Sequence, residues 1–348
     1  ATIDAAFRGA GFLPEVIEKD RNQTEFKRST EDYLNIAASD ERVALGRSKY
    51  AAYSGVLTAL QSRYGVDAQI IAAVWGLESF FGTRRGNVPV VSALSTLAYE
   101  GRRGEFFEGQ LTAALRILQR GDTTAGQMTG SWAGAMGHTQ FIPTSYLEFA
   151  VDYTGDGRAD IWGEDPTDAL ASTAAYLSRS GWQAGMPWGM EVLLPAGFNT
   201  SLLGRGKGKS AAEWSSLGVR SATGQALAAG SIITPAGTGG PAFLLTRNFA
   251  AILRYNNAEN YALGVGHLSD RLAGGGPLRA SFGPDAAGMT KADRQEMQRL
   301  LTAKGFDTGG TDGVIGAKSK SAIEAFQVNR GLAVTGEPSL DLLRLLRR

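Results

Sequence analysis

The spacing of apolar residues predicts a chain that is helical up to about residue 185. Apolar side chains recur at helical spacing from Asp40 to about Tyr64, so we expect one long amphipathic helix that Gly46 or Gly55 could interrupt. The same spacing predicts further helices at 92–98, 105–118 and 168–180. The first half of the chain therefore belongs to a mainly α fold class.

The pattern changes in the second half of the chain. Short apolar stretches alternate with Gly and Pro, which predicts a small β-containing insert, before helical spacing returns. A Gly- and Pro-rich tract then precedes a segment of a size and pattern typical of a three-helix module. The predicted domains are a helical N-terminal region and core at 1–185, the insert at 186–246, a return to the core at 247–272, a linker at 273–288 and the module at 289–348.

One short helix, predicted from Asp67 to Gly82, carries a carboxylate on its apolar face. Ile71, Val74 and Phe81 share that face with Glu78. Burial disfavours a charged carboxylate, so we expect the pKa of Glu78 to lie above its ordinary value, as a general acid near neutral pH requires. The alternative is a structural glutamate that binds a neighbouring loop through hydrogen bonds.

A glycine-rich stretch at 130–150 contains polar residues that form a second candidate site. Its three closely spaced glycines indicate that the backbone approaches either another element or a ligand. Ser131 and Gln140 are the polar side chains expected to face a cleft, and a helix should begin again at Pro143. A tight helix crossing built on small residues would give the same pattern.

The segment Asp152–Asp160 has the spacing of a calcium loop. Oxygen-bearing side chains stand at its first, third, fifth and ninth positions, with a glycine at the sixth. The twelfth position holds Gly163 where a glutamate is expected, so Glu164, Asp165 or Asp168 would have to complete the ligand shell. Without a metal, the same residues would form a simple turn.

Composition limits the chemistry that the chain can perform. Lys and Arg total 35 against 34 Asp and Glu, a net charge of +1, which gives no nucleic-acid footprint. No apolar run is long enough for a membrane span. The absence of cysteine excludes disulfides and thiolate sites, and two isolated histidines argue against zinc chemistry or a Ser-His-Asp triad.

Four motifs together resemble the B-type lytic murein transglycosylases, glycoside hydrolase family 103. In the family's order they are WGLESFFG, GSWAGAMGHTQFIPTSY, DYTGDGRADIW and RYNNAENYA, and the resemblance covers about residues 5–272. The C-terminal sequences MQRLLTAKGF and TDGVIGAKSKSAIEAFQVNRGLAVTG are similar to the type 1 peptidoglycan-binding module. The resemblance implies a lysozyme-like helical catalytic core followed by that module.

The resemblance also implies an activity and a set of site residues. Glu78 matches the single catalytic acid, which cleaves the MurNAc-β-1,4-GlcNAc bond without water, acting as acid and then as base, and leaves 1,6-anhydroMurNAc ends. The implied substrate-binding residues are Tyr33, Ser131, Gln140, Tyr176, Tyr255, Asn256 and Tyr261. The implied ligands of a structural Ca²⁺ are Asp152, Thr154, Asp156, the carbonyl of Arg158, and Asp168, and the chemistry itself requires no cofactor.

Peptidoglycan glycan strands and stem peptides are the expected partners, and other cell-wall enzymes could join them. The expected location is the periplasm, with an export signal already removed. Two other functions stay open at this point: a hydrolytic muramidase, which needs a second carboxylate, and a non-catalytic scaffold that binds peptidoglycan. The acids that follow Glu78, Glu100 and Glu105, lie in another segment, which favours the single-acid reaction.

Overall fold

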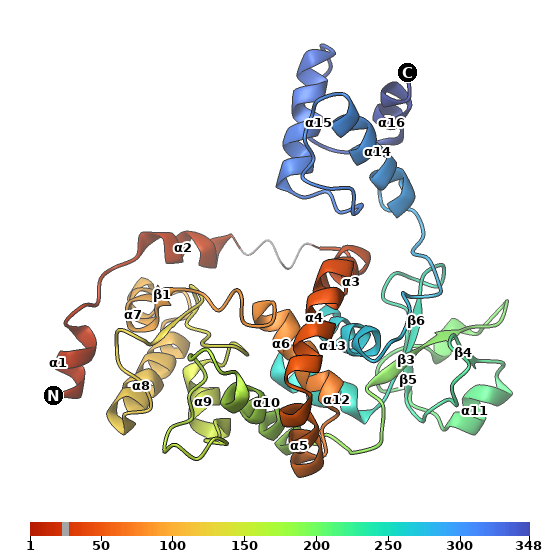
Figure 1. Ribbon diagram of the computed structural model, residues 1–348. Helices are drawn as coiled ribbons and strands as arrows, with labels where there is room; N and C mark the ends of the chain where they lie inside the picture. Colours follow the sequence, from red (N-terminus) through yellow and green to blue (C-terminus); the bar gives the residue numbers. More distant parts are fainter. Residues whose placement is uncertain (23–27) are drawn as a thin grey trace. The chain divides into compact units, whose positions relative to one another are not determined.

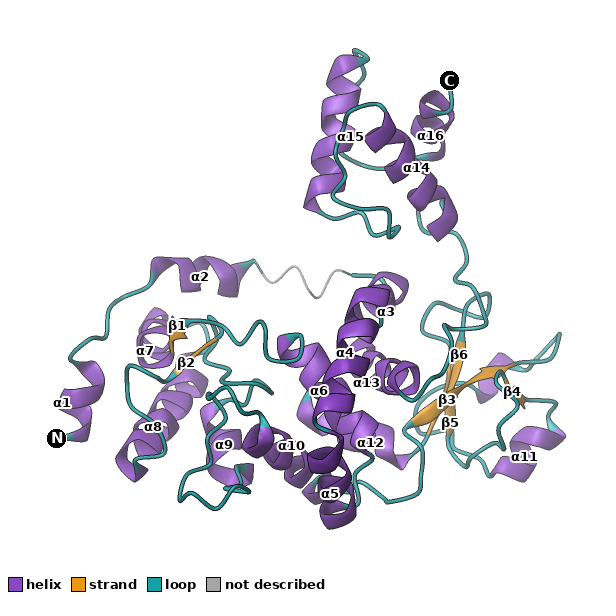
Figure 2. Ribbon diagram, in the orientation of Figure 1, coloured by secondary structure: helices purple, strands orange, loops and turns teal. Residues whose placement is uncertain are grey.

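The computed structural model describes residues 1–22 and 28–348 (Figure 1). It is mainly helical, with a two-stranded and a four-stranded sheet (Figure 2), so the predicted fold class is confirmed. The residues group into two compact units: 1–28, 36–189 and 245–277 form the first, and 29–35, 190–244 and 278–348 form the second. None of the helices in the described ranges has the length and apolar character needed to cross a membrane.

The first unit is built from helices that were largely predicted by apolar spacing. They are α1 (Thr2–Phe7), α2 (Pro14–Arg21), α4 (Asp40–Ala52), α5 (Ser54–Tyr64), α6 (Ala68–Ser79), α7 (Val90–Glu100), α8 (Gly104–Arg120), α9 (Pro143–Phe149), α10 (Thr167–Arg179), α12 (Arg247–Tyr255) and α13 (Glu259–Leu272). Strands β1 (Val88–Pro89) and β2 (Thr129–Gly130) pair antiparallel, and α3 (Thr30–Ala37) contains a boundary between the two units.

The long helix predicted from Asp40 to Tyr64 is wrong as a single element. The chain leaves helical geometry at Tyr53, which separates α4 from α5, and both candidate glycines stay helical. Gly46 has a packing role instead: a Cβ atom there would lie 2.5 Å from Cζ of Phe81. Gly76 on α6 is similar, at 2.6 Å from the same atom. These two glycines therefore make room for the Phe81 ring between α4 and α6.

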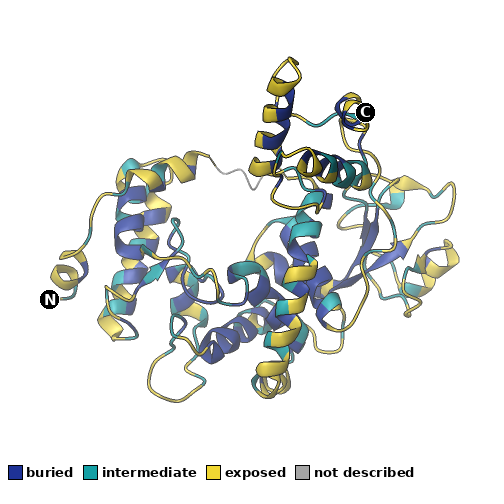
Figure 3. Cartoon of the chain, turned by 45° about the horizontal axis from the view of Figure 1, so that its top comes forward, coloured by how far each residue is buried: buried dark blue, intermediate teal, exposed yellow. Residues whose placement is uncertain are grey.

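Helix α6 lies at the centre of the first unit. It packs against α4, α5, α10 and α13, and nine of its residues are buried. A second cluster joins α7, α8 and α9 through side chains that include Leu94, Phe107 and Ile117. Figure 3 shows several surrounding helices with one buried and one exposed side, as expected for amphipathic helices around a core.

The insert in the second unit forms the predicted β structure. Its strands are β3 (Gly189–Leu193), β4 (Arg220–Ser221), β5 (Ser231–Ile233) and β6 (Ala242–Leu245), in the order β4-β3-β6-β5. β3 and β4 pair antiparallel, with Val192 opposite Ser221. Helix α11 (Ala211–Ser216) and the 3₁₀ turn η2 (Thr200–Leu202) complete the insert, and Trp214 of α11 is fully buried in its core.

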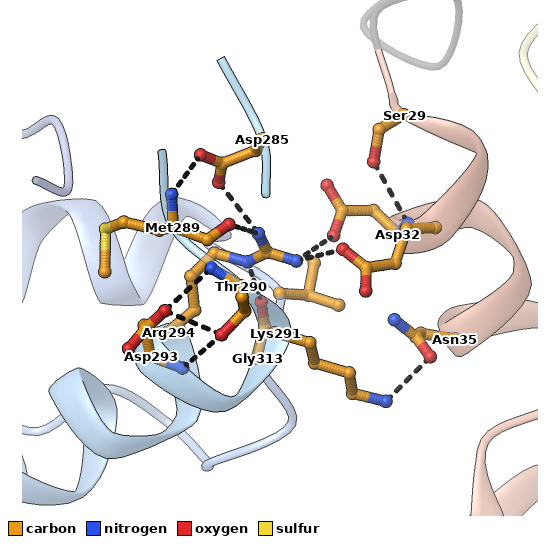
Figure 4. A network of polar contacts seen from close by, with 12 residues as sticks. Ser29, Asp32, Asn35, Asp285, Met289, Thr290, Lys291, Asp293, Arg294 and Gly313 are labelled. Atoms are coloured by element: carbon orange, nitrogen blue, oxygen red, sulfur yellow. Dashed lines mark hydrogen bonds and ion pairs between the residues drawn. The ribbon is translucent and has the colours of Figure 1, made fainter. Parts of the chain in front are cut away.

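The C-terminal segment has the three predicted helices, α14 (Lys291–Ala303), α15 (Ala317–Asn329) and α16 (Leu340–Leu346). Their core includes Met297, Ile323 and Leu343, all fully buried. Arg294 of α14 is buried and ion-paired with Glu31 and with Asp285, the latter at 2.8 Å (Figure 4). The segment 29–35 is therefore joined to the C-terminal helices by a buried cation.

Candidate active site

Glu78 lies in the last turn of α6, where the helix ends earlier than predicted. The predicted end of the helix was Gly82, but Phe80 and Phe81 already adopt left-handed φ values of 51° and 56°. Such values are costly for residues with a Cβ atom and persist only where surrounding contacts enforce them. Here the Phe81 N–H donates to the carbonyl of Trp75, and the Arg84 N–H donates to that of Ser79 at 2.8 Å.

The side chain of Glu78 is half-buried, next to the fully buried Ile71 and Val74 of the same helix. Tyr261 of α13 donates its hydroxyl hydrogen bond to Oε1 of Glu78 at 2.6 Å. The sequence placed these two residues in separate motifs, and the packing of α13 on α6 brings them into contact. The carboxyl group is thus held by a buried tyrosine, while Glu78 as a residue stays partly exposed.

Two further tyrosines, Tyr255 and Tyr176, form a row of aromatic rings with Tyr261. The ring of Tyr255 is parallel to that of Tyr261 at a centroid distance of 6.5 Å, and Tyr176 lies 4.8 Å from Tyr255. Burial, with a smaller contribution from the charge of Glu78, raises the pKa of Tyr255 well above its ordinary value. Its hydroxyl therefore stays neutral and donates to the Thr139 carbonyl at 2.6 Å.

The remaining predicted binding residues differ in their surroundings. Asn256 follows Tyr255 at the C-cap of α12 and is exposed. Tyr33 lies on α3 in the part that belongs to the second unit, so its role stays a prediction. The hydroxyl of Ser131 accepts hydrogen bonds from the N–H groups of Ala133 and Ala135 and so holds its own turn.

Gln140 adopts an unusual backbone conformation, with φ of 52°. Its side-chain nitrogen donates to the carbonyls of Arg85, at 2.9 Å, and Gly137, at 2.8 Å. Within the described residues its side-chain oxygen accepts no hydrogen bond, so a ligand donor could use it. A Cβ atom on Gly137 would lie 2.2 Å from the carbonyl oxygen of Ile161, so at this glycine the close approach is to another protein segment.

Two residues that sequence reasoning did not select lie beside this site. His138 is 4% exposed, and burial lowers the pKa of its imidazole. Arg85 donates to the carbonyls of Trp162 and Gly163 and pairs with Glu164. No local pattern marks either residue, because their partners lie more than twenty positions away along the chain.

The predicted calcium loop brings three carboxylates together. Oxygens of Asp152, Asp156 and Asp168 lie within 4.8 Å of one another. Asp168 is buried, which raises the pKa of its carboxyl group, although N–H groups of Tyr153, Thr154 and Asp160 donate to it and act in the opposite direction. Three clustered carboxylates repel one another, and an oxygen-binding cation would relieve that repulsion, so the donor set fits Ca²⁺.

The structure also distinguishes the three acids that the sequence left open for the last ligand position. Glu164 pairs with Arg85, and Asp165 accepts hydrogen bonds from the backbone and hydroxyl of Thr167. Asp160, at the ninth loop position, accepts the N–H groups of Trp162 and Gly163. Asp168 is the acid that joins Asp152 and Asp156.

Comparison with known proteins gives consistent results along the chain. The profile of the Transglycosylase SLT domain family matches residues 1–270, and that of a peptidoglycan binding domain matches residues 290–346. The chain is 33% identical over 229 residues to membrane-bound lytic murein transglycosylase B of Escherichia coli K12. That match covers 64% of this chain and 61% of the relative, which is less than two thirds of the relative's length.

Solved structures are similar over larger shares of the chain. SltB3 of Pseudomonas aeruginosa, crystallised with NAG-anhNAM-pentapeptide, is 48% identical with a TM-score of 0.77, over 100% of this chain and 94% of that one. Escherichia coli Slt35, crystallised with calcium, is 30% identical with a TM-score of 0.65, over 76% of this chain and 84% of that one. The predicted family is confirmed: the chain belongs to the lytic transglycosylases with an SLT domain, and it carries a C-terminal peptidoglycan binding domain.

Proposed function

We propose that this protein is a lytic transglycosylase that cleaves the MurNAc-β-1,4-GlcNAc bond of peptidoglycan without water. The observation that best supports this proposal is the half-buried Glu78, whose Oε1 accepts the hydroxyl hydrogen bond of Tyr261. Membership of the transglycosylase family and the muropeptide complex of the SltB3 relative support the same activity. The next acid along the chain, Glu100, is paired with Arg21 at 2.6 Å, which favours a reaction with one carboxyl group.

In the proposed reaction, Glu78 first donates a proton to the glycosidic oxygen, which leaves with the GlcNAc unit. The muramyl 6-hydroxyl then attacks the anomeric carbon of the same sugar, and the Glu78 carboxylate accepts the hydroxyl proton. Because the new bond forms within the MurNAc unit, the product is a 1,6-anhydroMurNAc end.

Other residues are proposed to bind the substrate or a cation. We assign Tyr33, Ser131, Gln140, Tyr176, Tyr255, Asn256 and Tyr261 to sugar and acetamido contacts. Asp152, Thr154, Asp156, the Arg158 carbonyl and Asp168 would hold a structural Ca²⁺, as the acidic cluster and the calcium complex of the Slt35 relative suggest. A calcium ion there would stabilise the loop and take no part in proton transfer.

The C-terminal domain is proposed to bind glycan strands or stem peptides. The pentapeptide bound to the SltB3 relative supports this assignment, as does the match to a peptidoglycan binding domain. A protein that acts on peptidoglycan works in the cell envelope, and we place this one in the periplasm. Other cell-wall enzymes remain proposed partners.

Replacement of the catalytic acid tests the proposed reaction. Glu78→Gln should lower the release of anhydromuropeptides from purified sacculi by at least about 100-fold, because the amide cannot transfer a proton, while sacculus binding persists. Glu105→Gln, an exposed acid on α8, is the matched control and should keep full activity. An active Glu78→Gln variant, or products that are one water heavier by mass spectrometry, would refute the proposal.

A further inference from the structure

The last turn of a helix is weakly held, and this is where Glu78 lies. Carbonyl groups there lack partners within the helix, so such turns fray unless other contacts restrain them. The two residues that follow, Phe80 and Phe81, adopt left-handed backbone conformations that are unfavourable for residues with a Cβ atom. Some contact beyond the helix must therefore keep Glu78 in a defined position.

His138 contacts α6 on both sides of Glu78. Its ring Nδ1 is 3.2 Å from Nε1 of Trp75, three positions before Glu78. Its carbonyl accepts the hydroxyl hydrogen bond of Ser79, directly after Glu78. The same hydroxyl accepts the N–H of Gly82 at 2.9 Å, so the contact extends through the left-handed turn.

The hydrogen bonds of His138 define its tautomer. The indole N–H of Trp75 can only donate, so Nδ1 must be the acceptor and carries no proton. A neutral imidazole that accepts at Nδ1 has its single proton on Nε2, which lies 2.8 Å from the carbonyl oxygen of Gly163 and 3.2 Å from Nη1 of Arg85. The imidazole is thus neutral and joins α6 to the segment that contains Gly163.

The surroundings of His138 keep its ring in place. A Cβ atom on Gly82 would lie 2.5 Å from Nδ1, so the turn after Glu78 packs directly on the imidazole. Trp75 is fully buried and makes edge contacts with Tyr53 and Phe81. Movement of Trp75 would therefore be transmitted to Phe81 and to the turn that follows the catalytic acid.

We propose that His138 is a positioning residue for Glu78 and that it acts, as the neutral Nε2–H tautomer, through Trp75 and Ser79. The inference rests on the proposed transglycosylase reaction, in which the carboxyl group must lie within hydrogen-bond reach of the glycosidic oxygen. Small displacements of a catalytic group can lower a rate by up to about 100-fold. His138 itself transfers no proton to the substrate.

Kinetics on a soluble peptidoglycan chain of defined length test the proposal. His138→Phe should lower kcat about 10-fold or more with KM within about twofold, since positioning changes the chemical step more than binding. His138→Asn should recover part of kcat, because its side-chain oxygen can replace Nδ1 as the acceptor for Trp75. Trp182→Phe, which removes a buried indole N–H without a partner, is the control and should leave kcat unchanged.

A double-mutant cycle shows whether His138 acts through Trp75. Trp75→Phe should lower kcat to a similar extent, and the double variant with His138→Phe should be at most about threefold slower than the slower single variant. Independent losses that multiply to about 100-fold would overturn the proposal. If His138→Phe does not fold, Trp75→Phe and His138→Asn still test the proposal. A wild-type kcat in both of these variants would also overturn the positioning role of His138.

Nuclear magnetic resonance gives a readout that does not depend on activity. The indole ¹⁵N–¹H signal of Trp75, assigned by its loss in Trp75→Phe, should move upfield in His138→Phe and stay near its wild-type position in His138→Asn. An unchanged signal in His138→Phe would refute the hydrogen bond. Failure of the function itself is distinguishable, because wild-type protein would then release no anhydromuropeptides at all.

Discussion

At the scale of single residues, the environment of Glu78 depends on one hydroxyl group from a distant motif. The apolar pattern of α6 predicted a carboxylate among buried side chains, and Ile71 and Val74 are indeed fully buried. The pattern could not predict that Tyr261, 183 positions later, donates to Oε1. A hydroxyl donor favours the ionised carboxylate, whereas burial favours the protonated one, so these two effects oppose each other at Glu78.

Removal of that hydroxyl should change the pH dependence of catalysis. In Tyr261→Phe the ionised form of Glu78 loses a hydrogen bond, so the alkaline limb of the kcat profile should move to higher pH. We also expect kcat to fall about 10-fold, because Oε1 is no longer oriented. The measurement is a pH–rate profile, with Tyr99→Phe, at an 86% exposed tyrosine, as the control. An unshifted limb would show that Tyr261 does not tune the acid.

The buried His267 on α13 should make folding stability dependent on pH. Burial, assisted by Arg271, lowers the pKa of His267 to about 4. An unfolded histidine titrates near 6.5, so between about 4 and 6.5 the unfolded chain binds the additional proton and stability rises with pH. The contribution is on the order of 3 kcal/mol, present in full above about pH 6.5 and lost as the pH falls to about 4.

Urea unfolding between pH 4 and 7 measures this effect. His267→Gln should show a smaller rise in unfolding free energy over that range than the wild type. The remaining slope should come partly from His138, the second histidine of the chain, whose pKa is lowered by burial as well. An unchanged slope in His267→Gln would mean that this imidazole does not titrate below its ordinary range.

At the scale of elements, local sequence patterns predicted where most helices form. Pro143 begins α9 as expected for a proline in the first turn, and the Gly and Pro punctuation correctly indicated the insert. Helix ends were harder to predict. Helix α6 ends at Ser79, whose hydroxyl donates to the carbonyl of His138. A contact between such distant residues cannot be predicted from local helix propensity.

The loop from Asp152 to Asp168 is the element for which sequence spacing was most informative. Addition of Ca²⁺ should raise the midpoint of thermal unfolding, and a chelator should reverse the increase, because an ion that binds the folded state stabilises it. Asp156→Asn should abolish the increase by removing one of the three clustered carboxylates. Asp165→Asn should retain the increase in the unfolding midpoint, because the Asp165 carboxylate accepts a hydrogen bond from the Thr167 hydroxyl instead of joining the cluster. Equal responses in both variants would contradict the assignment.

At the scale of the whole molecule, residues 29–35 and the C-terminal segment belong to the same unit although they are far apart in the sequence. Arg294 is 5% exposed and is surrounded by Glu31, Asp32 and Asp285 (Figure 4). Lys291 on the same helix donates to Asn35 at 2.7 Å. Domain prediction from composition separated 1–185 from 289–348, and it had no means to show that residues 29–35 group with the C-terminal segment.

Loss of the buried guanidinium should release residues 29–35. Arg294→Met leaves the carboxylates of Glu31, Asp32 and Asp285 without their shared cation, and breaking a buried ion pair in this way costs about 3–5 kcal/mol. Hydrogen exchange of the amides in 29–35 should then become faster, as measured by mass spectrometry. Arg299→Met, at an exposed arginine of the same helix, is the control and should leave exchange unchanged. Wild-type exchange in Arg294→Met would show that the ion pair does not hold this segment.

The sequence by itself determined the helical fold class and the family, because these depend on short-range periodicity and on contiguous motifs, and the same motifs led to the proposal that Glu78 is the catalytic acid. It also determined which residues could form the calcium loop, since most of its oxygen donors are a few positions apart. Only the tertiary structure decided that Tyr261 binds Glu78, that Asp168 joins the acidic cluster, and that His138 contacts α6 on both sides of Glu78. These contacts connect residues of separate segments, and packing between helices, rather than local sequence, sets their distances.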